Sequence, residues 1–125
     1  MAEEKTFENK VKAFLDSQES WYLKYWAGGG FTKSGIPDLL VCCSGHFLGV
    51  EIKASKGKPS LLQLRTLRQI EDAGGYGILL YPEYFEVFKN LILCIKLNDQ
   101  NAAYNYDILR CKRKEWEDKL IGMIQ

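Results

Sequence analysis

Apolar side chains near the amino terminus recur at the spacing of an amphipathic helix. Within residues 6–18, the side chains that share one helical face are Phe7, Val11, Phe14 and Leu15. Thr6 comes directly before them and is predicted to cap the helix. Residues 21–26 read WYLKYW and precede a run of glycines. This pattern predicts an aromatic strand that leads into a loop.

Two apolar runs on either side of residues 44–45, which are Ser-Gly, predict a β-hairpin with strands over 38–43 and 46–53. If the Ser-Gly pair forms the whole turn, the hairpin register places Asp38 opposite Glu51. A three-residue turn would instead move the aspartate to the other face of the sheet. The length of this turn therefore decides whether the two carboxylates meet.

A second helix is predicted from a start signal, an apolar stripe and a stop signal. Ser60 and Gln63 have the spacing of a capping box, in which each side chain bonds to the backbone of the other residue. The apolar stripe consists of Leu61, Leu64, Leu67 and Ile70. Gly74 is expected to end this helix, and residues 77–81 then predict a buried strand.

The order helix, strand, strand, strand, helix, strand predicts a mixed central sheet flanked by helices, in the α/β class and close to α+β. The segment from Tyr104 onward is harder to interpret. We expect a strand near Ile108 and a closing helix that contains Trp116 and Leu120. The 125 residues are 46% hydrophobic and 26% charged, which fits one globular domain over residues 1–125.

The chain is expected to be a soluble, cytoplasmic protein. Its apolar runs are far shorter than the roughly 20 residues that cross a bilayer, and its first ten residues do not resemble a signal peptide. The cysteines form no CxxC pair, and the single histidine, His46, cannot complete a Cys/His zinc site. They are expected to be buried free thiols in a reducing compartment: Cys42, Cys43, Cys94 and Cys111.

The formal net charge of +1 favours no particular partner, but the basic residues are unevenly distributed. One group falls within sixteen positions and consists of Lys53, Lys56, Lys58, Arg65 and Arg68. A second group is the consecutive run over residues 112–114. Each group is either a solvated surface or a contact for a phosphate backbone.

Asp38, Glu51 and Lys53 are charged residues within otherwise apolar strands. Directly opposed side chains have Cβ atoms about 5 Å apart, so two carboxylates at that spacing repel each other. Mg²⁺ or Mn²⁺ would remove this conflict, because both prefer oxygen ligands. Lys53 would then lie beside the metal and any bound phosphate. The alternative is a salt-bridge cluster on an exposed face of the sheet.

The same residues carry a resemblance to a known family. IPD at 36–38 and EIK at 51–53 resemble the signature of PD-(D/E)XK nucleases. More narrowly, the stretches SGIPDLLV, GVEIKAS and PSLLQLRTLRQIEDAGG resemble the VRR-NUC branch, in its small stand-alone form from phages and bacteria. The resemblance covers about residues 5–82.

This resemblance implies a metal-dependent endodeoxyribonuclease with a restriction-endonuclease-like core. Asp38, Glu51 and the carbonyl of Ile52 would bind Mg²⁺ or Mn²⁺, and Lys53 would assist hydrolysis. The family also uses an acidic residue on its first helix. Glu8 is our choice, acting directly or through water, with Glu3 and Glu4 as alternatives. Gln63 matches a glutamine near the family's site, and we expect this role to compete with the capping box.

The resemblance also implies a homodimer that cuts four-way (Holliday) junctions. The basic residues expected to contact DNA are Lys33, Lys56, Lys58 and Arg65. Aromatic residues that could form a twofold contact, or fill the core instead, are Tyr22, Tyr25, Trp26 and residues 85–88. Alternatives are a nuclease for flap, linear or single-stranded DNA or for RNA, and a catalytically inert nucleic-acid-binding module.

Overall fold

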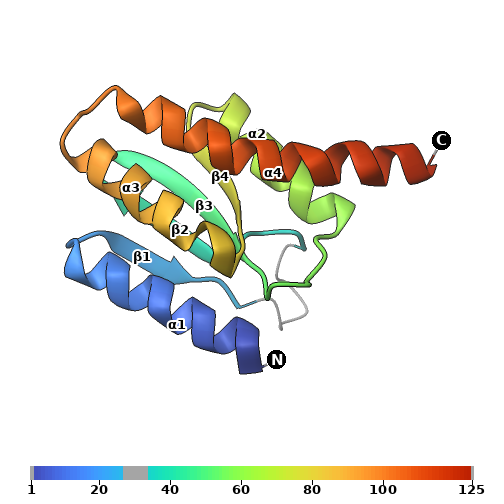
Figure 1. The fold of residues 1–125 in the computed structure, drawn as a ribbon, viewed down its shortest axis with the longest axis horizontal. Helices are drawn as coiled ribbons and strands as arrows, with labels where there is room; N and C mark the ends of the chain where they lie inside the picture. The colour runs from blue at the N-terminus through green and yellow to red at the C-terminus, as the bar shows by residue number, and fades with distance from the viewer. Residues whose placement is uncertain (1, 27–33, 125) are drawn as a thin grey trace.

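The computed structural model describes residues 2–26 and 34–124 (Figure 1). Lys33 therefore lies outside the described residues. The elements in chain order are α1 (Ala2–Ser17), β1 (Trp21–Lys24), β2 (Leu39–Cys43), β3 (His46–Ile52), α2 (Leu61–Asp72), β4 (Tyr76–Leu80), the 3₁₀ turn η1 (Pro82–Tyr84), α3 (Phe85–Lys96) and α4 (Asn101–Ile124).

The four strands form one mixed sheet in the order β1-β2-β3-β4. The β1–β2 and β2–β3 pairs are antiparallel, whereas β4 runs parallel to β3. The parallel pair is joined through α2, as a parallel connection requires a long crossover. The predicted element order and the mixed sheet flanked by helices are confirmed, in an α+β arrangement.

The hairpin between β2 and β3 has the two-residue turn that its sequence predicts. Ser44 and Gly45 both have positive φ, at 50° and 83°, as a type I′ turn requires. The register follows from this turn, because Cys43 pairs with His46 and Leu40 pairs with Gly49. The strands therefore present the faces that we predicted.

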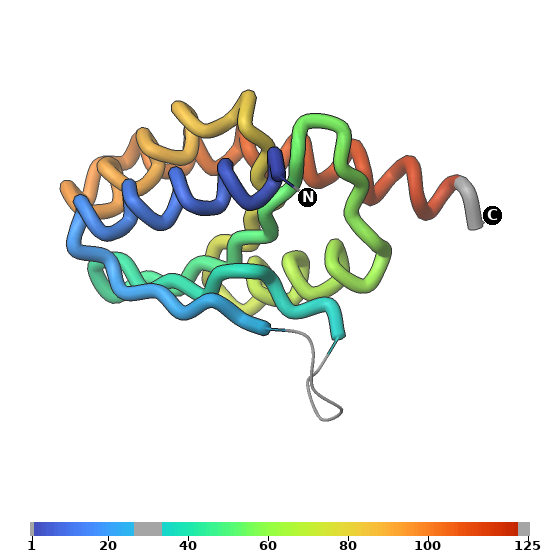
Figure 2. The backbone as a smooth tube through the Cα atoms, turned by 90° about the horizontal axis from the view of Figure 1, so that it is seen from below, coloured from blue at the N-terminus to red at the C-terminus, as the bar shows by residue number. Residues whose placement is uncertain are grey.

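Helices cover the two faces of the sheet unequally. On one face, α1 and α3 run beside each other over the strands (Figure 2), and their apolar side chains pack onto Val41, Leu48 and Val50. On the other face, Leu64 and Leu67 of α2 pack against Leu79. Side chains that remain exposed on the strands include Trp21, Leu23, Cys42 and Phe47. The second face is thus covered mainly over β3 and β4.

Predictions for the cysteines and for the start of α1 need correction. All four cysteines are free, but Cys42 and Cys111 are exposed, and only Cys43 is fully buried. The neighbours at positions 42 and 43 point to opposite faces, as expected for a strand. Helix α1 begins at Ala2, so Thr6 lies inside it and is not its cap. Residues 2–5 extend the helix because Glu3 and Glu4 favour a helical first turn.

The carboxyl-terminal third of the chain consists of two helices, α3 and α4, joined by a short turn over residues 97–100, and contains no strand where it is described. The predicted strand near Ile108 is wrong, because this residue lies within α4. The closing helix with Trp116 and Leu120 is confirmed, although it begins much earlier than expected. Both views show the carboxyl end of α4 extending past the rest of the domain (Figures 1 and 2).

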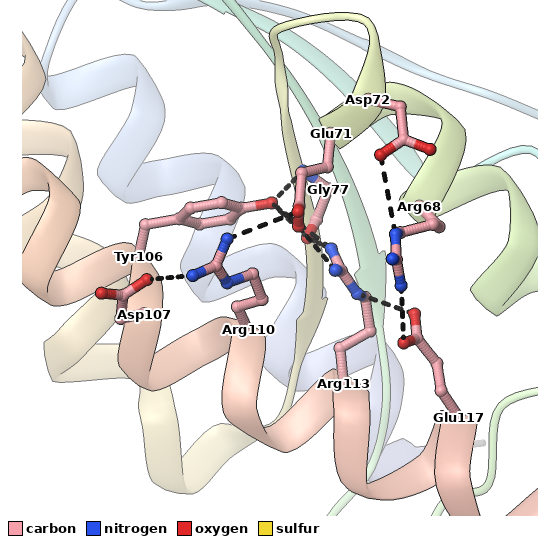
Figure 3. A network of polar contacts seen from close by, with 9 residues as sticks. All are labelled: Arg68, Glu71, Asp72, Gly77, Tyr106, Asp107, Arg110, Arg113 and Glu117. Carbon is pink, nitrogen blue, oxygen red and sulfur yellow. Dashed lines mark hydrogen bonds and ion pairs between the residues drawn. The ribbon is translucent and has the colours of Figure 1, made fainter.

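Helix α4 is attached to β4 and α2 through a buried polar network (Figure 3). Arg113 is fully buried and donates to the Gly77 carbonyl at 2.9 Å and to a Glu71 carboxylate oxygen at 2.6 Å. The Tyr106 hydroxyl accepts from the Gly77 amide at 3.0 Å. Since β4 is the last strand of the sheet, these α4 side chains satisfy backbone groups that no further strand could bond.

The aromatic residues proposed for a twofold contact lie partly in the core and partly on the outside of the protein. Phe88 is fully buried, and Tyr22 and Phe85 pack against the main core. In contrast, 69% of Trp26 is exposed. Most of this set therefore fills the core, which was the alternative to a twofold contact. Within residues 2–26 and 34–124, no helix combines the length and apolarity needed to cross a bilayer.

Candidate metal centre

The loop before β2 is shaped by a glycine that packs on the start of α2. Gly35 has a φ of 81°, and a Cβ at this position would lie 2.7 Å from the Leu62 side chain. Only glycine accommodates both the conformation and the close approach. Because Leu62 adjoins Gln63, this packing holds the loop that carries Asp38 against the turn that carries the glutamine.

Asp38 lies one position before β2, at the end of the β2–β3 ladder. The last ladder pair is Leu39 with Val50, so the register places Asp38 opposite Glu51. One carboxylate oxygen of Asp38 accepts a hydrogen bond from the Ile52 amide at 2.8 Å. The carbonyl of Ile52 lies on the same edge of β3, since the N–H and C=O of a strand residue point to one side. The three proposed metal-binding residues are therefore neighbours.

Glu51 is a buried carboxylate whose charge is only partly compensated by hydrogen bonds and ion pairs. Its residue exposure is 3%, and its Oε2 accepts from Gln63 Nε2 at 3.0 Å and pairs with Lys53 Nζ at 3.5 Å. Its Oε1 is buried without a hydrogen-bond partner among the described residues. Burial, together with the charge of Asp38, raises the pKa of Glu51 to about 8, although Lys53 opposes this shift.

Gln63 performs two roles at once. Its Oε1 accepts from the Ser60 amide at 2.9 Å, while the Ser60 hydroxyl accepts from the Gln63 amide at 3.1 Å. The predicted capping box is thus confirmed. Its Nε2 simultaneously donates to Glu51. We expected a role near the site to compete with the capping box; in the structure one amide caps the helix and contacts Glu51, because its two ends point to different partners.

Glu8 is buried on α1 and surrounded by lysines. Lys24 Nζ lies 2.6 Å from its Oε1, and Lys12 and Lys5 lie 3.0 and 3.5 Å from its Oε2. Burial alone would raise the pKa of Glu8, but Lys24 and Lys12 hold it below its usual value. The alternative Glu3 accepts from the Ser55 hydroxyl at 2.5 Å. Of these acids, Glu8 is the one joined to Asp38, through Lys24.

Lys24 is a member of the site that the sequence did not reveal to us. Its Nζ also lies 3.4 Å from an Asp38 oxygen. The signal was present in the alternation of β1, where Lys24 shares the inward face with Tyr22 and so places a charge where an apolar residue is expected. Of the predicted DNA contacts, those that the structure describes are all exposed: Lys56, Lys58 and Arg65.

The donor set around Asp38 and Glu51 fits Mg²⁺ or Mn²⁺. It consists of hard oxygen ligands, and the unbonded Glu51 oxygen and the raised pKa of Glu51 are both features that a divalent cation would relieve. No group of three or more His, Cys, Asp or Glu side chains in the described part of the chain is arranged to hold a metal ion. The proposed set uses two carboxylates and a backbone carbonyl.

Comparisons with known proteins provide no relative. No protein-family model matches the chain, and searches of curated proteins and of solved structures also found no match.

The raised pKa of Glu51 predicts a pH-dependent stability of the metal-free protein. Glu51 binds its proton more tightly when folded, so its contribution is complete below the ordinary pKa of 4.5 and is lost as pH rises through about 8. From pH 6 to 9, the free energy of unfolding should fall by about 3 kcal/mol more in the wild type than in Glu51→Gln. Urea denaturation in EDTA measures this difference. Equal slopes in the two proteins would contradict the shift.

Proposed function

We propose that this protein is a divalent-metal-dependent endodeoxyribonuclease of the PD-(D/E)XK type, with a restriction-endonuclease-like core and a VRR-NUC-like motif. The observation that supports this most strongly is the convergence of Asp38, Glu51 and Lys53 at one end of the β2–β3 hairpin, with Gln63 bonded to Glu51. The resemblance in sequence assigns the same four residues to a nuclease site.

The metal would be held by the Asp38 and Glu51 carboxylates and by the carbonyl of Ile52. A bound Mg²⁺ or Mn²⁺ polarises a phosphoryl oxygen and acidifies a water molecule. Gln63 fixes the orientation of Glu51, because its own position is fixed by the capping box. The hydrogen bond from the Ile52 amide fixes Asp38 in the same way.

Lys53 supplies the positive charge that phosphodiester hydrolysis requires beside the metal. Its side chain is 12% exposed, and its ammonium lies near Glu51. A partly desolvated ammonium at this place stabilises the negative charge that develops on the phosphate oxygens in the transition state. Lys56 and Lys58 follow in the same loop and are exposed, and we expect them to contact the phosphates of the DNA backbone.

The substrate is proposed to be branched DNA, in particular a four-way junction, cut by a homodimer. Two identical sites related by a twofold axis suit a substrate with two symmetric strands. This part of the proposal rests on the resemblance to small stand-alone VRR-NUC nucleases. A general or flap nuclease and an inert binding module are separate outcomes of the test below.

The test compares cleavage of labelled four-way junction, flap, linear duplex and single strand, with Mg²⁺, Mn²⁺ or EDTA. We expect metal-dependent cuts at symmetric positions of the junction. Lys53→Met should lower the cleavage rate by about a hundredfold or more, because it removes a charge used in the transition state. Lys10→Met, an exposed lysine on α1, is the matched control and should cut normally.

The other outcomes separate the alternatives. If flap, linear or single-stranded DNA is cut as fast as the junction, the proposed substrate becomes DNA of a broader class. If wild type and Lys53→Met bind the junction equally and neither cuts any DNA, the nuclease proposal fails in favour of a binding module. Light scattering on the same samples tests the homodimer, and a monomer bound to a cleaved junction would contradict it.

A further inference from the structure

Lys24 lies between two carboxylates of the candidate metal centre. It is the last residue of β1, and its side chain is only 18% exposed. Its ammonium lies 2.6 Å from Glu8 and 3.4 Å from Asp38, so one cation connects α1 to the start of β2. Burial alone would lower the pKa of Lys24, but the two carboxylates raise it above its usual value. The ion-pair geometry therefore identifies Lys24 as a cation held between two carboxylates.

Asp38 lies between two other carboxylates, Glu8 and Glu51, which differ in how well nearby lysines compensate their negative charge. On one side, both oxygens of Glu8 lie within ion-pair distance of lysines, and Lys24 and Lys12 are the nearest. On the other side, Glu51 has one ion pair among the described residues, from its Oε2 to Lys53 at 3.5 Å. Within that part of the chain, Glu8 Oε2 and Glu51 Oε1 both lack a hydrogen bond, but only the Glu8 oxygen lies within ion-pair distance of lysines. A further cation would thus meet repulsion beside Glu8 and attraction beside Glu51.

We propose that Lys24 is the resident cation of the Glu8–Asp38 half of the site, so that each chain binds one divalent metal ion, between Asp38 and Glu51. Glu8 then positions the lysine and is not a ligand of a second metal. This inference rests on the proposed function, because it assumes that Asp38 and Glu51 bind metal. It assigns Lys24 as a positioning residue that holds the Asp38 carboxylate in place as the metal binds and leaves.

Mn²⁺ is a suitable probe, because free and bound Mn²⁺ can be counted by electron paramagnetic resonance. We expect one Mn²⁺ per wild-type chain and two per chain in Lys24→Met, where Glu8 and Asp38 become accessible to a second ion. Lys12→Met is the matched control, since Lys12 pairs with Glu8 and has no described ion pair with Asp38. This variant should still bind one ion.

A second variant tests the role of Glu8 directly. Glu8→Gln should change the affinity of the single Mn²⁺ site less than threefold if Glu8 positions the lysine. A loss of tenfold or more would identify Glu8 as a metal ligand and overturn the inference. Circular dichroism before titration confirms that each variant is folded.

The remaining outcomes distinguish this inference from the proposed function. Two Mn²⁺ ions per wild-type chain would overturn the role of Lys24 and leave the nuclease proposal intact. A single ion in both wild type and Lys24→Met would show that the lysine does not exclude a second metal. A wild-type chain that binds no Mn²⁺ would instead overturn the proposed metal centre itself.

Discussion

Replacing Asp38 by asparagine is expected to lower metal-dependent DNA cleavage by about a thousandfold and to weaken Mn²⁺ binding at least tenfold. Asparagine retains an oxygen that can accept from the Ile52 amide, so the loop should keep its position. It loses the negative charge that a divalent cation needs, and a lost metal site removes several kcal/mol of transition-state stabilisation. Single-turnover cleavage and Mn²⁺ titration measure the two effects.

The matched control for this variant is Asp72→Asn. Asp72 is a largely exposed carboxylate on α2, with an ion pair to Arg68 at 3.6 Å. The same chemical change there should leave cleavage and metal binding unchanged within about twofold. If Asp38→Asn kept normal cleavage and normal Mn²⁺ affinity, Asp38 would belong to a structural charge cluster, and the metal centre would be wrongly assigned.

Replacing Arg113 by methionine is expected to lower the free energy of unfolding by about 3 to 5 kcal/mol. Methionine fills much of the volume of the arginine, but it leaves Glu71 and the Gly77 carbonyl without their shortest hydrogen bonds (Figure 3). The loss is costly because a buried carbonyl and a carboxylate that is only 20% exposed both lose a fully buried donor, and Glu71 keeps only Arg110, at 3.4 Å, as an ion-pair partner among the described residues. This loss is a large fraction of the 5 to 15 kcal/mol that typically stabilises a domain. Urea denaturation at pH 7 provides the measurement.

Two further variants test whether the loss in free energy of unfolding arises because Glu71 is left without Arg113. Arg68→Met removes an arginine whose side chain is 51% exposed, and it should cost no more than about 1 kcal/mol. Arg113→Met combined with Glu71→Met removes both charges and should be more stable than Arg113→Met alone. If Arg113→Met is as stable as wild type, the network contributes nothing to the fold.

The sequence was most informative where local chemistry decides structure. The Ser44-Gly45 turn fixes the hairpin register, and this register brings Asp38 and Glu51 together. The capping-box spacing of Ser60 and Gln63 correctly places the start of α2. In each case a few adjacent residues specify a backbone geometry, so the prediction did not depend on distant contacts.

The parts that could not be predicted depend on distant contacts. In α4 the buried face includes Asn105, Tyr106 and Arg113, because this face bonds to a strand edge as well as packing on apolar side chains. Such a face has no continuous apolar stripe, so hydropathy could not identify the amino-terminal half of the helix. The role of Lys24 was hidden for a similar reason, since its partner Glu8 lies 16 positions away on another element.

The bonds from α4 to the outer edge of β4 also constrain how the chain folds during synthesis. The stretch that carries the sequence resemblance ends near residue 82, yet the Gly77 backbone is bonded by Tyr106 and Arg113. When β4 has just emerged from the ribosome, its outer edge has no partner. This edge stays open until roughly thirty more residues, which carry Tyr106 and Arg113, have also emerged. Since an open edge is a template for pairing with other chains, this interval is when a chaperone would protect the protein most.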